Sequence, residues 1–188
     1  MNNKDLKVAV LGAGAMGCLF GGLLAEKGLN VTLIDVWKEH VEEINKNGLK
    51  MDGHGGDRFI KIPATSDPST IGKVDAVIVM CKATALEPAL KSIKNIIRDK
   101  TVFMSFQNGI GHEAIIKSIV GDEKVIGGTT TQASNILGPG HIMNHAALPS
   151  WIGEYDGGIT DRITEIADTF TAHNLSLIHI SEPTRRLV

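Results

Sequence analysis

One stretch constrains the fold of this chain more than any other: Gly12-Ala13-Gly14-Ala15-Met16-Gly17. It is a GxGxxG pattern, and it follows the apolar run Leu6–Leu11, which has the length and composition of a buried strand. The next segment, Ala15–Lys27, carries apolar residues at helical spacing. We therefore predict a strand, a tight turn and a helix as the first unit of the fold.

Each glycine of this pattern has its own physical role. Gly12 permits the tight turn, Gly14 lets a pyrophosphate approach the backbone, and Gly17 lets the helix pack closely on the strand. The N-terminus of the helix adds free N–H groups and the positive end of its dipole. The residues predicted to bind the pyrophosphate of a dinucleotide are Gly12, Ala13, Gly14, Ala15, Met16 and Gly17.

The alternation of strand-like and helix-like segments continues along the chain. Further strands are expected at Val31–Ile34, Ala76–Met80, Val102–Phe106 and Lys124–Thr131, and further helices at Lys38–Asn47, Leu86–Ile97, His112–Ile119 and Ile159–His173. Leu49–Ile62 is expected to form a hairpin inserted at the sheet edge, and Gln132–Glu154 to form antiparallel strands. The pattern predicts an α/β fold with a doubly wound, mainly parallel sheet and an antiparallel extension.

Composition and charge exclude several classes of protein. The net charge of −2 and the pI of about 6.4 give no basic surface for nucleic acid. No apolar run reaches the roughly 20 residues that cross a membrane, and no signal-peptide pattern opens the chain. The two cysteines, Cys18 and Cys81, are expected to be free thiols, and the cytoplasm is the expected location. His141 and His145 have no ligand set around them, so no metal site is expected.

Asp35 ends the second strand, 18 positions after Gly17. A carboxylate at this position accepts hydrogen bonds from the adenosine ribose hydroxyls and repels a 2′-phosphate. Taken alone, Asp35 therefore favours NAD(H) over NADP(H). Lys38 lies near enough in sequence to offset that charge or to bind a phosphate, and an exposed aspartate that simply ends a strand remains an alternative.

Two further segments follow strands at the edge where open α/β sheets bind ligands. Lys82, in Cys81-Lys82-Ala83, can reach a ribose, a carboxamide or a substrate carboxylate, unless it is an ordinary surface lysine. Asn108, in Gln107-Asn108-Gly109-Ile110-Gly111, can offer a donor and an acceptor to a ligand. The alternative for Asn108 is a simple Asn-Gly turn.

Together, these motifs resemble the ketopantoate reductase (2-dehydropantoate 2-reductase) family. The resemblance rests on the glycine turn, on the segments around Lys82 and Asn108, and on Gly128-Thr129-Thr130-Thr131, in the family's order. Pro139-Gly140-His141-Ile142 and Ile152-Gly153-Glu154 are similar to the family's later strands. The resemblance spans about Lys7 to Asn174.

The resemblance implies a two-domain oxidoreductase that reduces ketopantoate, a 2-oxo acid, to pantoate for pantothenate and coenzyme A biosynthesis. Its N-terminal, Rossmann-like domain holds NADP(H), and a helical C-terminal domain completes the active site. By resemblance, Lys82 and Ser134 contact the cofactor, and Asn108 touches both cofactor and substrate. Asp35 departs from an NADP-linked pattern, so NAD(H) stays open. The loop at 145–149 lacks the glycines that often follow this histidine in the family.

The end of the sequence departs further from the family. The family's general acid is a lysine early in the C-terminal domain, and no matching Trp-x-Lys-Leu occurs here. Leu175–Arg185 instead resembles the translation of a transposon-type sequencing adapter. We therefore expect a NAD(P)-binding domain at 1–174, a non-native tail at 175–188, a missing helical domain and no catalytic residue in this fragment. A lost general acid lowers the rate about 10²- to 10⁴-fold, so we expect the fragment to be inactive alone.

Two other functions stay open at this point. One is a different two-domain dehydrogenase that acts on another hydroxy acid, and the other is a stand-alone dinucleotide-binding module without chemistry. The missing C-terminal sequence would decide between the two enzymes, and a native stop codon after Val188 would favour the stand-alone module, whereas an adapter junction in the nucleotide sequence would count against it.

Overall fold

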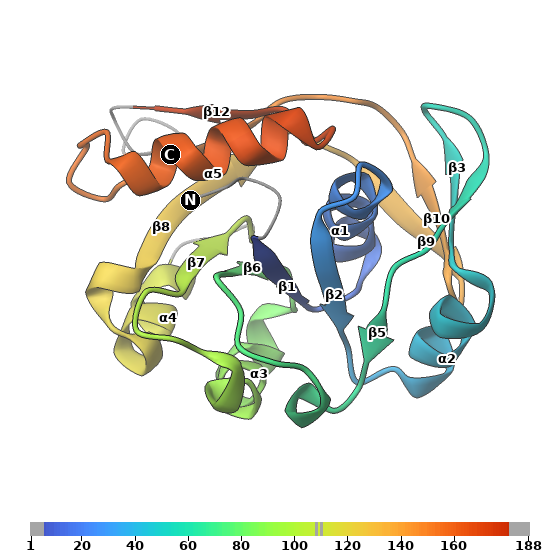
Figure 1. Ribbon diagram of the computed structural model, residues 1–188, viewed down its shortest axis with the longest axis horizontal. Coiled ribbons are helices and arrows are strands. Elements are labelled where there is room, and N and C mark those ends of the chain that lie inside the picture. The colour runs from blue at the N-terminus through green and yellow to red at the C-terminus, as the bar shows by residue number, and fades with distance from the viewer. Residues whose placement is uncertain (1–5, 108, 110, 181–188) are drawn as a thin grey trace.

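Figure 1 shows the computed structural model of the chain, which describes residues 6–107, 109 and 111–180. The strands of the main sheet are β1 Lys7–Leu11, β2 Asn30–Ile34, β5 Ala64–Thr65, β6 Ala76–Val79, β7 Val102–Ser105, β8 Val125–Thr130, β11 Ser150–Gly153 and β12 Leu177–His179. Their order across the sheet is β12-β11-β8-β7-β6-β1-β2-β5. The six strands from β5 to β8 in that order are parallel, and β11 runs antiparallel to β8. The predicted parallel sheet with an antiparallel extension is confirmed.

Helices cover both faces of this sheet. They are α1 Ala15–Glu26, α2 Lys38–Asn47, α3 Leu86–Ser92, α4 His112–Val120 and α5 Asp161–Ala172, with 3₁₀ turns η1 Pro68–Thr70, η2 Ala83–Ala85, η3 Lys94–Ile96 and η4 Asp122–Lys124. Alternate residues of β1 face opposite cores: Val8 and Val10 pack in the core beneath α1 and α5, and Ala9 and Leu11 in the core beneath α3 and α4. The sheet is therefore doubly wound, as predicted.

The third helix is shorter than the predicted Leu86–Ile97. It ends at Ser92, and its last backbone bonds close after three residues instead of four: the Ile93 N–H donates to the Leu90 carbonyl oxygen at 3.4 Å. The Ser92 hydroxyl also donates to the carbonyl of Ala89 at 2.7 Å. Because this bonding tightens the last turn, the chain continues as the 3₁₀ turn η3.

The hairpin expected at the edge of the main sheet lies elsewhere, so that placement was wrong. β3 (Leu49–Gly53) and β4 (Arg58–Ile60) do form an antiparallel pair, but they join β9 (Ser134–Gly138) and β10 (His141–Asn144) in a second sheet, of order β4-β3-β10-β9. This sheet covers α1, where a Cβ on Gly22 would lie 2.8 Å from the Met51 side chain. The bare helix surface at Gly22 and the buried side chains of β3 explain why the hairpin packs on α1.

Described residues of the segment 175–188 also pack on the domain. Leu175 is fully buried, and Leu177 begins β12, which pairs in parallel with β11 at the sheet edge. Packing does not reveal the origin of a segment, so the non-native origin of residues 175–188 stays a prediction. Within the described ranges, none of the helices is long and apolar enough to span a membrane.

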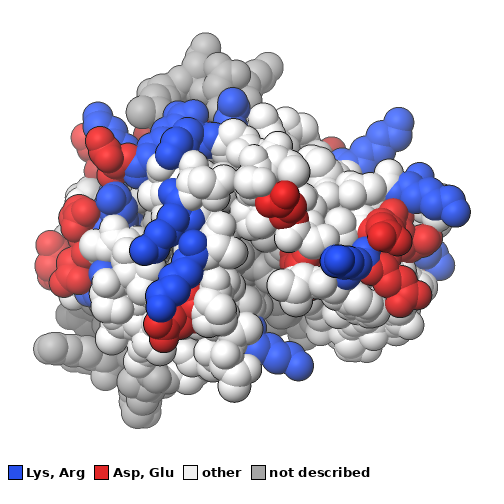
Figure 2. Space-filling view, turned by 90° about the horizontal axis from the view of Figure 1, so that it is seen from below, with Lys and Arg blue, Asp and Glu red and all other residues white. Residues whose placement is uncertain are grey.

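The carboxyl ends of the parallel strands lie together at one edge of the sheet. In Figure 1, β1 and β2 run downward, so at these two strands the edge lies toward the bottom of the view. Figure 2 looks onto it from below and shows a mainly uncharged surface between two groups of charged side chains. β1 and β6 are neighbours here, while the strands that follow each of them in sequence lie on opposite sides. Such a change of direction is where open α/β sheets bind ligands.

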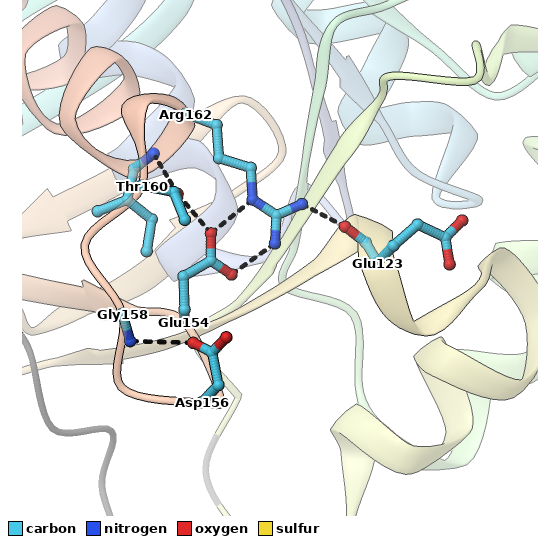
Figure 3. A network of polar contacts seen from close by, with 7 residues as sticks. Glu123, Glu154, Asp156, Gly158, Thr160 and Arg162 are labelled. Carbon is cyan, nitrogen blue, oxygen red and sulfur yellow. Dashed lines mark hydrogen bonds and ion pairs between the residues drawn. The ribbon is translucent and has the colours of Figure 1, made fainter.

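The end of β11 is joined to α5 by the network in Figure 3. The Nε of Arg162 donates to Glu154 Oε1 at 2.6 Å, and its Nη2 donates to Oε2 at 2.5 Å, while its Nη1 donates to the Glu123 carbonyl. The Thr160 hydroxyl donates to Glu154 Oε1 at 2.6 Å. Glu154 is 5% exposed, so its charge depends on these partners.

Replacing Arg162 by methionine is expected to lower the free energy of unfolding by about 2 kcal/mol, because Glu154 keeps only its Thr160 bond. Burial alone would raise the pKa of Glu154, but the bonds from Arg162 and Thr160 hold it below its ordinary value. Urea unfolding at several pH values measures the free energy of unfolding of the parent protein and of Arg162→Met. A carboxylate whose pKa is lowered in the folded state stabilises the fold at pH values above the ordinary carboxyl pKa. The difference in the free energy of unfolding between the parent protein and Arg162→Met should therefore shrink as the pH falls below about 4.

The matched control for this prediction is Arg98→Met, which removes an exposed pairing with Asp75. Exposed ion pairs contribute under about 1 kcal/mol, so this variant should stay close to the parent protein. Equal losses in the two variants would show that burial of Glu154 has no special weight.

Candidate functional site

The GxGxxG turn lies between β1 and α1, at the edge where β1 and β6 meet. Gly12 has φ +100°, a backbone conformation that favours glycine, and its N–H donates to the Ile34 carbonyl at 2.8 Å. A Cβ on Gly12 would lie 2.5 Å from the backbone nitrogen of Cys81, the residue that follows β6 by two positions. A Cβ on Gly17 would lie 1.9 Å from the Gly12 carbonyl oxygen. These two glycines are therefore required by packing inside the protein.

Gly14 differs from both, since a Cβ there would meet no atom within 4 Å. Packing within the domain thus gives no reason for glycine at this position. Gly14 is the N-cap residue of α1, which receives no side-chain cap and has no acidic residue in its first turn. Open space in front of uncapped helix N–H groups fits the pyrophosphate of a dinucleotide. The open space at Gly14 and the uncapped helix N-terminus therefore fit the binding of such a cofactor.

Asp35, the residue directly after β2, lies against the same turn. Its Oδ2 accepts a hydrogen bond from the Ala13 N–H at 2.7 Å, and its Oδ1 accepts one from the Trp37 N–H at 2.9 Å. Two backbone donors therefore fix the carboxylate beside the predicted pyrophosphate position. Lys38 is exposed and begins α2.

The two loops that follow β6 and β7 are joined at the same edge. The Gln107 side-chain amide donates to the carbonyl oxygen of Cys81, which precedes Lys82. Lys82 is exposed where η2 begins. Asn108 lies outside the described residues. Gln107, a part of the family motif without an assigned role, thus joins the end of the β7 segment to the residue before Lys82.

Ser134 belongs to the second sheet, as the first residue of β9. Its hydroxyl donates to the Met143 carbonyl at 2.8 Å, so a lone pair of the hydroxyl oxygen is what it could offer a ligand. Its contact with a cofactor stays a prediction.

The histidines considered as metal ligands make other contacts. The Nε2 of His141 lies 2.6 Å from Asp52 Oδ2, and the Nε2 of His145 lies 2.5 Å from Asn135 Oδ1. No group of three or more His, Cys, Asp or Glu side chains is arranged to hold a metal ion among the residues that the structure describes.

A buried residue near the glycine turn was missed by the sequence analysis. His40 is fully buried on α2, and its ring stacks on Trp37, close to Asp35. Its sequence signal is its place in the buried stripe of the helix, four residues before Ile44. A histidine in such a stripe is ordinarily a core residue, and only the structure shows its neighbours.

Two pockets in the described part of the chain lie away from the glycine turn. A pocket of about 350 Å³ opens at the opposite edge, between the amino ends of β6 and β7 and the start of α5, where Thr101 and Arg162 line it. A second, of about 460 Å³, lies between the end of α2 and the second sheet, beside Gly140 and His141. The predicted cofactor position lies in neither of these pockets, so it rests on the geometry of Gly14 and Asp35.

Comparison with known proteins gives consistent matches. A family model described as ketopantoate reductase PanE/ApbA matches residues 8–157. The chain is 38% identical over 170 residues to a 2-dehydropantoate 2-reductase from Pyrococcus horikoshii, which covers 90% of this chain and 54% of the relative. A relative of the same name from Streptococcus pyogenes is 30% identical over 171 residues, 90% of this chain and 55% of the relative. The chain thus spans about half the length of the curated relatives that it matches.

Solved structures agree with the sequence matches. The 2-dehydropantoate 2-reductase of Geobacter metallireducens superimposes with a TM-score of 0.86 at 30% identity, over 94% of this chain and 58% of that one. A D-mandelate dehydrogenase solved with NADH and anilino(oxo)acetate superimposes with a TM-score of 0.86 at 32% identity, over 93% of this chain and 56% of that one.

Proposed function

Because this chain belongs to the ketopantoate reductase family, we propose that it supplies the cofactor-binding half of a cytoplasmic reductase that converts ketopantoate to pantoate. The observation that carries the proposal is the open space at Gly14, in front of the uncapped N-terminus of α1. A nicotinamide dinucleotide bound there would supply the hydride that reduces the ketone of the substrate. Lys82 and Asn108 are the proposed contacts of its nicotinamide half, and Asn108 also of the substrate.

We propose that the domain boundary lies near Asn174, with residues 175–188 a non-native tail. The helical domain and its general-acid lysine would be missing from this sequence, which is consistent with the share of the relatives that it spans. Without a general acid, the developing alkoxide has no proton donor. We therefore expect this chain to bind the cofactor without measurable turnover.

One observation favours NAD(H) over the NADP(H) that the family resemblance implies. The Asp35 carboxylate is fixed beside the turn by two backbone N–H groups, so it cannot move away from a 2′-phosphate without losing both bonds. The NADH-bound D-mandelate dehydrogenase shares the fold at 32% identity, which keeps another 2-oxo acid as the second candidate substrate. Both candidates require the same cofactor turn.

The test is calorimetric titration of the chain with NADH and with NADPH. We expect NADH to bind at least about tenfold more tightly, because Asp35 accepts bonds from ribose hydroxyls and repels the 2′-phosphate. In Asp35→Asn the charge is removed while one oxygen still accepts the Ala13 N–H, so the difference between the cofactors should narrow to about threefold or less. A 2-oxo acid, first ketopantoate and then mandelate's oxo acid, is added at the end to measure turnover.

The matched control is Asp99→Asn, which removes the same charge from an exposed residue beside the pocket at the opposite edge. It should leave both affinities unchanged. A folded chain that binds neither cofactor would overturn the proposed function, and tighter binding of NADPH would overturn the role given to Asp35.

A further inference from the structure

His40 lies where four parts of the fold meet. Its Nδ1 accepts a hydrogen bond from the Gly140 backbone N–H at 3.0 Å, across 100 positions of sequence. Its Nε2 lies 3.3 Å from the Sγ of Cys18. The ring stacks on Trp37, with 4.8 Å between centroids and 14° between planes. One fully buried side chain on α2 thus contacts the second sheet, α1 and the segment after β2.

The hydrogen bonds assign the protons of this cluster. The Gly140 N–H can only donate, so Nδ1 is unprotonated and the neutral ring carries its proton on Nε2, toward Cys18. Burial lowers the pKa of His40, although the Asp35 charge and a bond to the Ala13 backbone act in the opposite direction. Burial also raises the pKa of Cys18, which therefore stays a thiol. A thiol donates, and its acceptor is the Ala13 carbonyl oxygen at 3.1 Å.

These contacts close a ring of five residues that includes the cofactor turn. Ala13 accepts from Cys18 at its carbonyl and donates its N–H to Asp35 at 2.7 Å. Asp35 accepts from the N–H of Trp37, and the ring of Trp37 stacks on His40. Ala13 lies in the turn that is proposed to hold the pyrophosphate, and Asp35 is the proposed ribose contact. A change at His40 therefore reaches Ala13 directly and through Cys18. It reaches Asp35 through Trp37.

We propose that His40 is a positioning residue for the adenosine end of the cofactor, holding the Ala13 turn and Asp35 in the arrangement that receives pyrophosphate and ribose. This inference rests on the proposed function, since it concerns the same site. The bond to Gly140 fixes the orientation of the ring, and the contacts with Cys18 and Trp37 carry that orientation to the turn and to Asp35. A histidine that only filled space would matter for stability and leave cofactor affinity unchanged.

The test measures the affinity of the full chain for NADH and for ADP-ribose, which lacks nicotinamide. His40→Phe keeps a stacking ring but loses every hydrogen bond of the imidazole nitrogens, so we expect both ligands to bind about tenfold more weakly. His40→Asn can still accept from the Gly140 N–H, and it should recover affinity to within about threefold of the parent. Equal affinities of His40→Phe and the parent would overturn the inference, and a loss confined to NADH would overturn the assignment to the adenosine end.

Three further variants keep the test decisive. Arg162→Met is the control for lost stability, because it weakens the domain at the opposite edge and should bind both ligands like the parent. If His40→Phe does not fold, Cys18→Ala and Cys18→Ser replace it: only serine keeps a donor for the Ala13 carbonyl, so alanine should bind about threefold more weakly. Equal binding by these two would overturn the inference. A parent chain that binds neither ligand would instead overturn the proposed function, and the inference with it.

Discussion

Gly17→Val is expected to lower the free energy of unfolding by about 3 kcal/mol or more, the largest effect on stability that we predict. A Cβ at this position would lie 1.9 Å from the Gly12 carbonyl oxygen and 3.3 Å from a methyl carbon of Val10. The first of these is a backbone atom of the tight turn, so no side-chain rotation relieves the clash. Helix α1 must move away from β1, and the packing of its buried face is then lost.

Thermal unfolding of the full chain measures this effect. For a chain of this size a loss of about 3 kcal/mol corresponds to a fall in Tm of roughly 6 to 12 °C. Gly21→Ala is the matched control within the same helix, because its Cβ would meet the end of the flexible Leu33 side chain at 2.6 Å instead of backbone. Its expected loss is smaller, about 1 kcal/mol. An unchanged Tm for Gly17→Val would mean that the close contact of turn and helix is not needed for the fold.

The main sheet could be predicted from the sequence because each of its signals is local. An apolar run, a glycine turn and a helical stripe follow one another within β1 and α1, and the rule of right-handed crossovers then orders the parallel strands. The requirement for Gly17 is likewise local, since a Cβ there would meet the Gly12 carbonyl oxygen, whereas the close neighbours of Gly12 are Met80 and Cys81, which follow β6.

The second sheet could not be predicted in the same way. The hairpin of β3 and β4 is visible in the sequence, but its partner β10 lies about 90 residues later, and the pairing of β10 with β3 is parallel. No local pattern relates His141 to Lys50, which lie opposite each other in that pair. Placement on α1 follows from the bare helix surface at Gly22, which has meaning only once the helix is packed.

The residues of the site likewise differ in whether their role could be predicted from the sequence. Asp35 could be found from its spacing after the glycine turn, and the structure adds that two backbone N–H groups fix it. His40 could not be assigned a role, because its partner Gly140 is 100 positions away and its contacts with Cys18 and Ala13 join segments that are distant in sequence. Buried polar contacts of this kind depend on tertiary structure, so sequence spacing carries no sign of them.

Gly14→Val is expected to weaken NADH binding at least about 100-fold, the largest effect on binding that we predict. The open space at Gly14 has no function in packing, because a Cβ there meets no protein atom within 4 Å. A valine would project into the space in front of the α1 N-terminus, where the pyrophosphate must approach the backbone N–H groups. Each lost contact with a charged phosphate oxygen is costly, since charge-assisted hydrogen bonds are about twice as strong as neutral ones.

The comparison with Gly17→Val makes this prediction specific, because both variants add the same side chain to the same turn. Gly14→Val replaces an N-cap glycine by a poorer capping residue, which should lower the free energy of unfolding by no more than about 1 kcal/mol. Calorimetry with NADH and thermal unfolding should therefore separate the two glycines: one needed for the fold, the other for the ligand. Parent-like affinity in a folded Gly14→Val chain would contradict the placement of the pyrophosphate at this turn, since no dinucleotide could lie across a valine there.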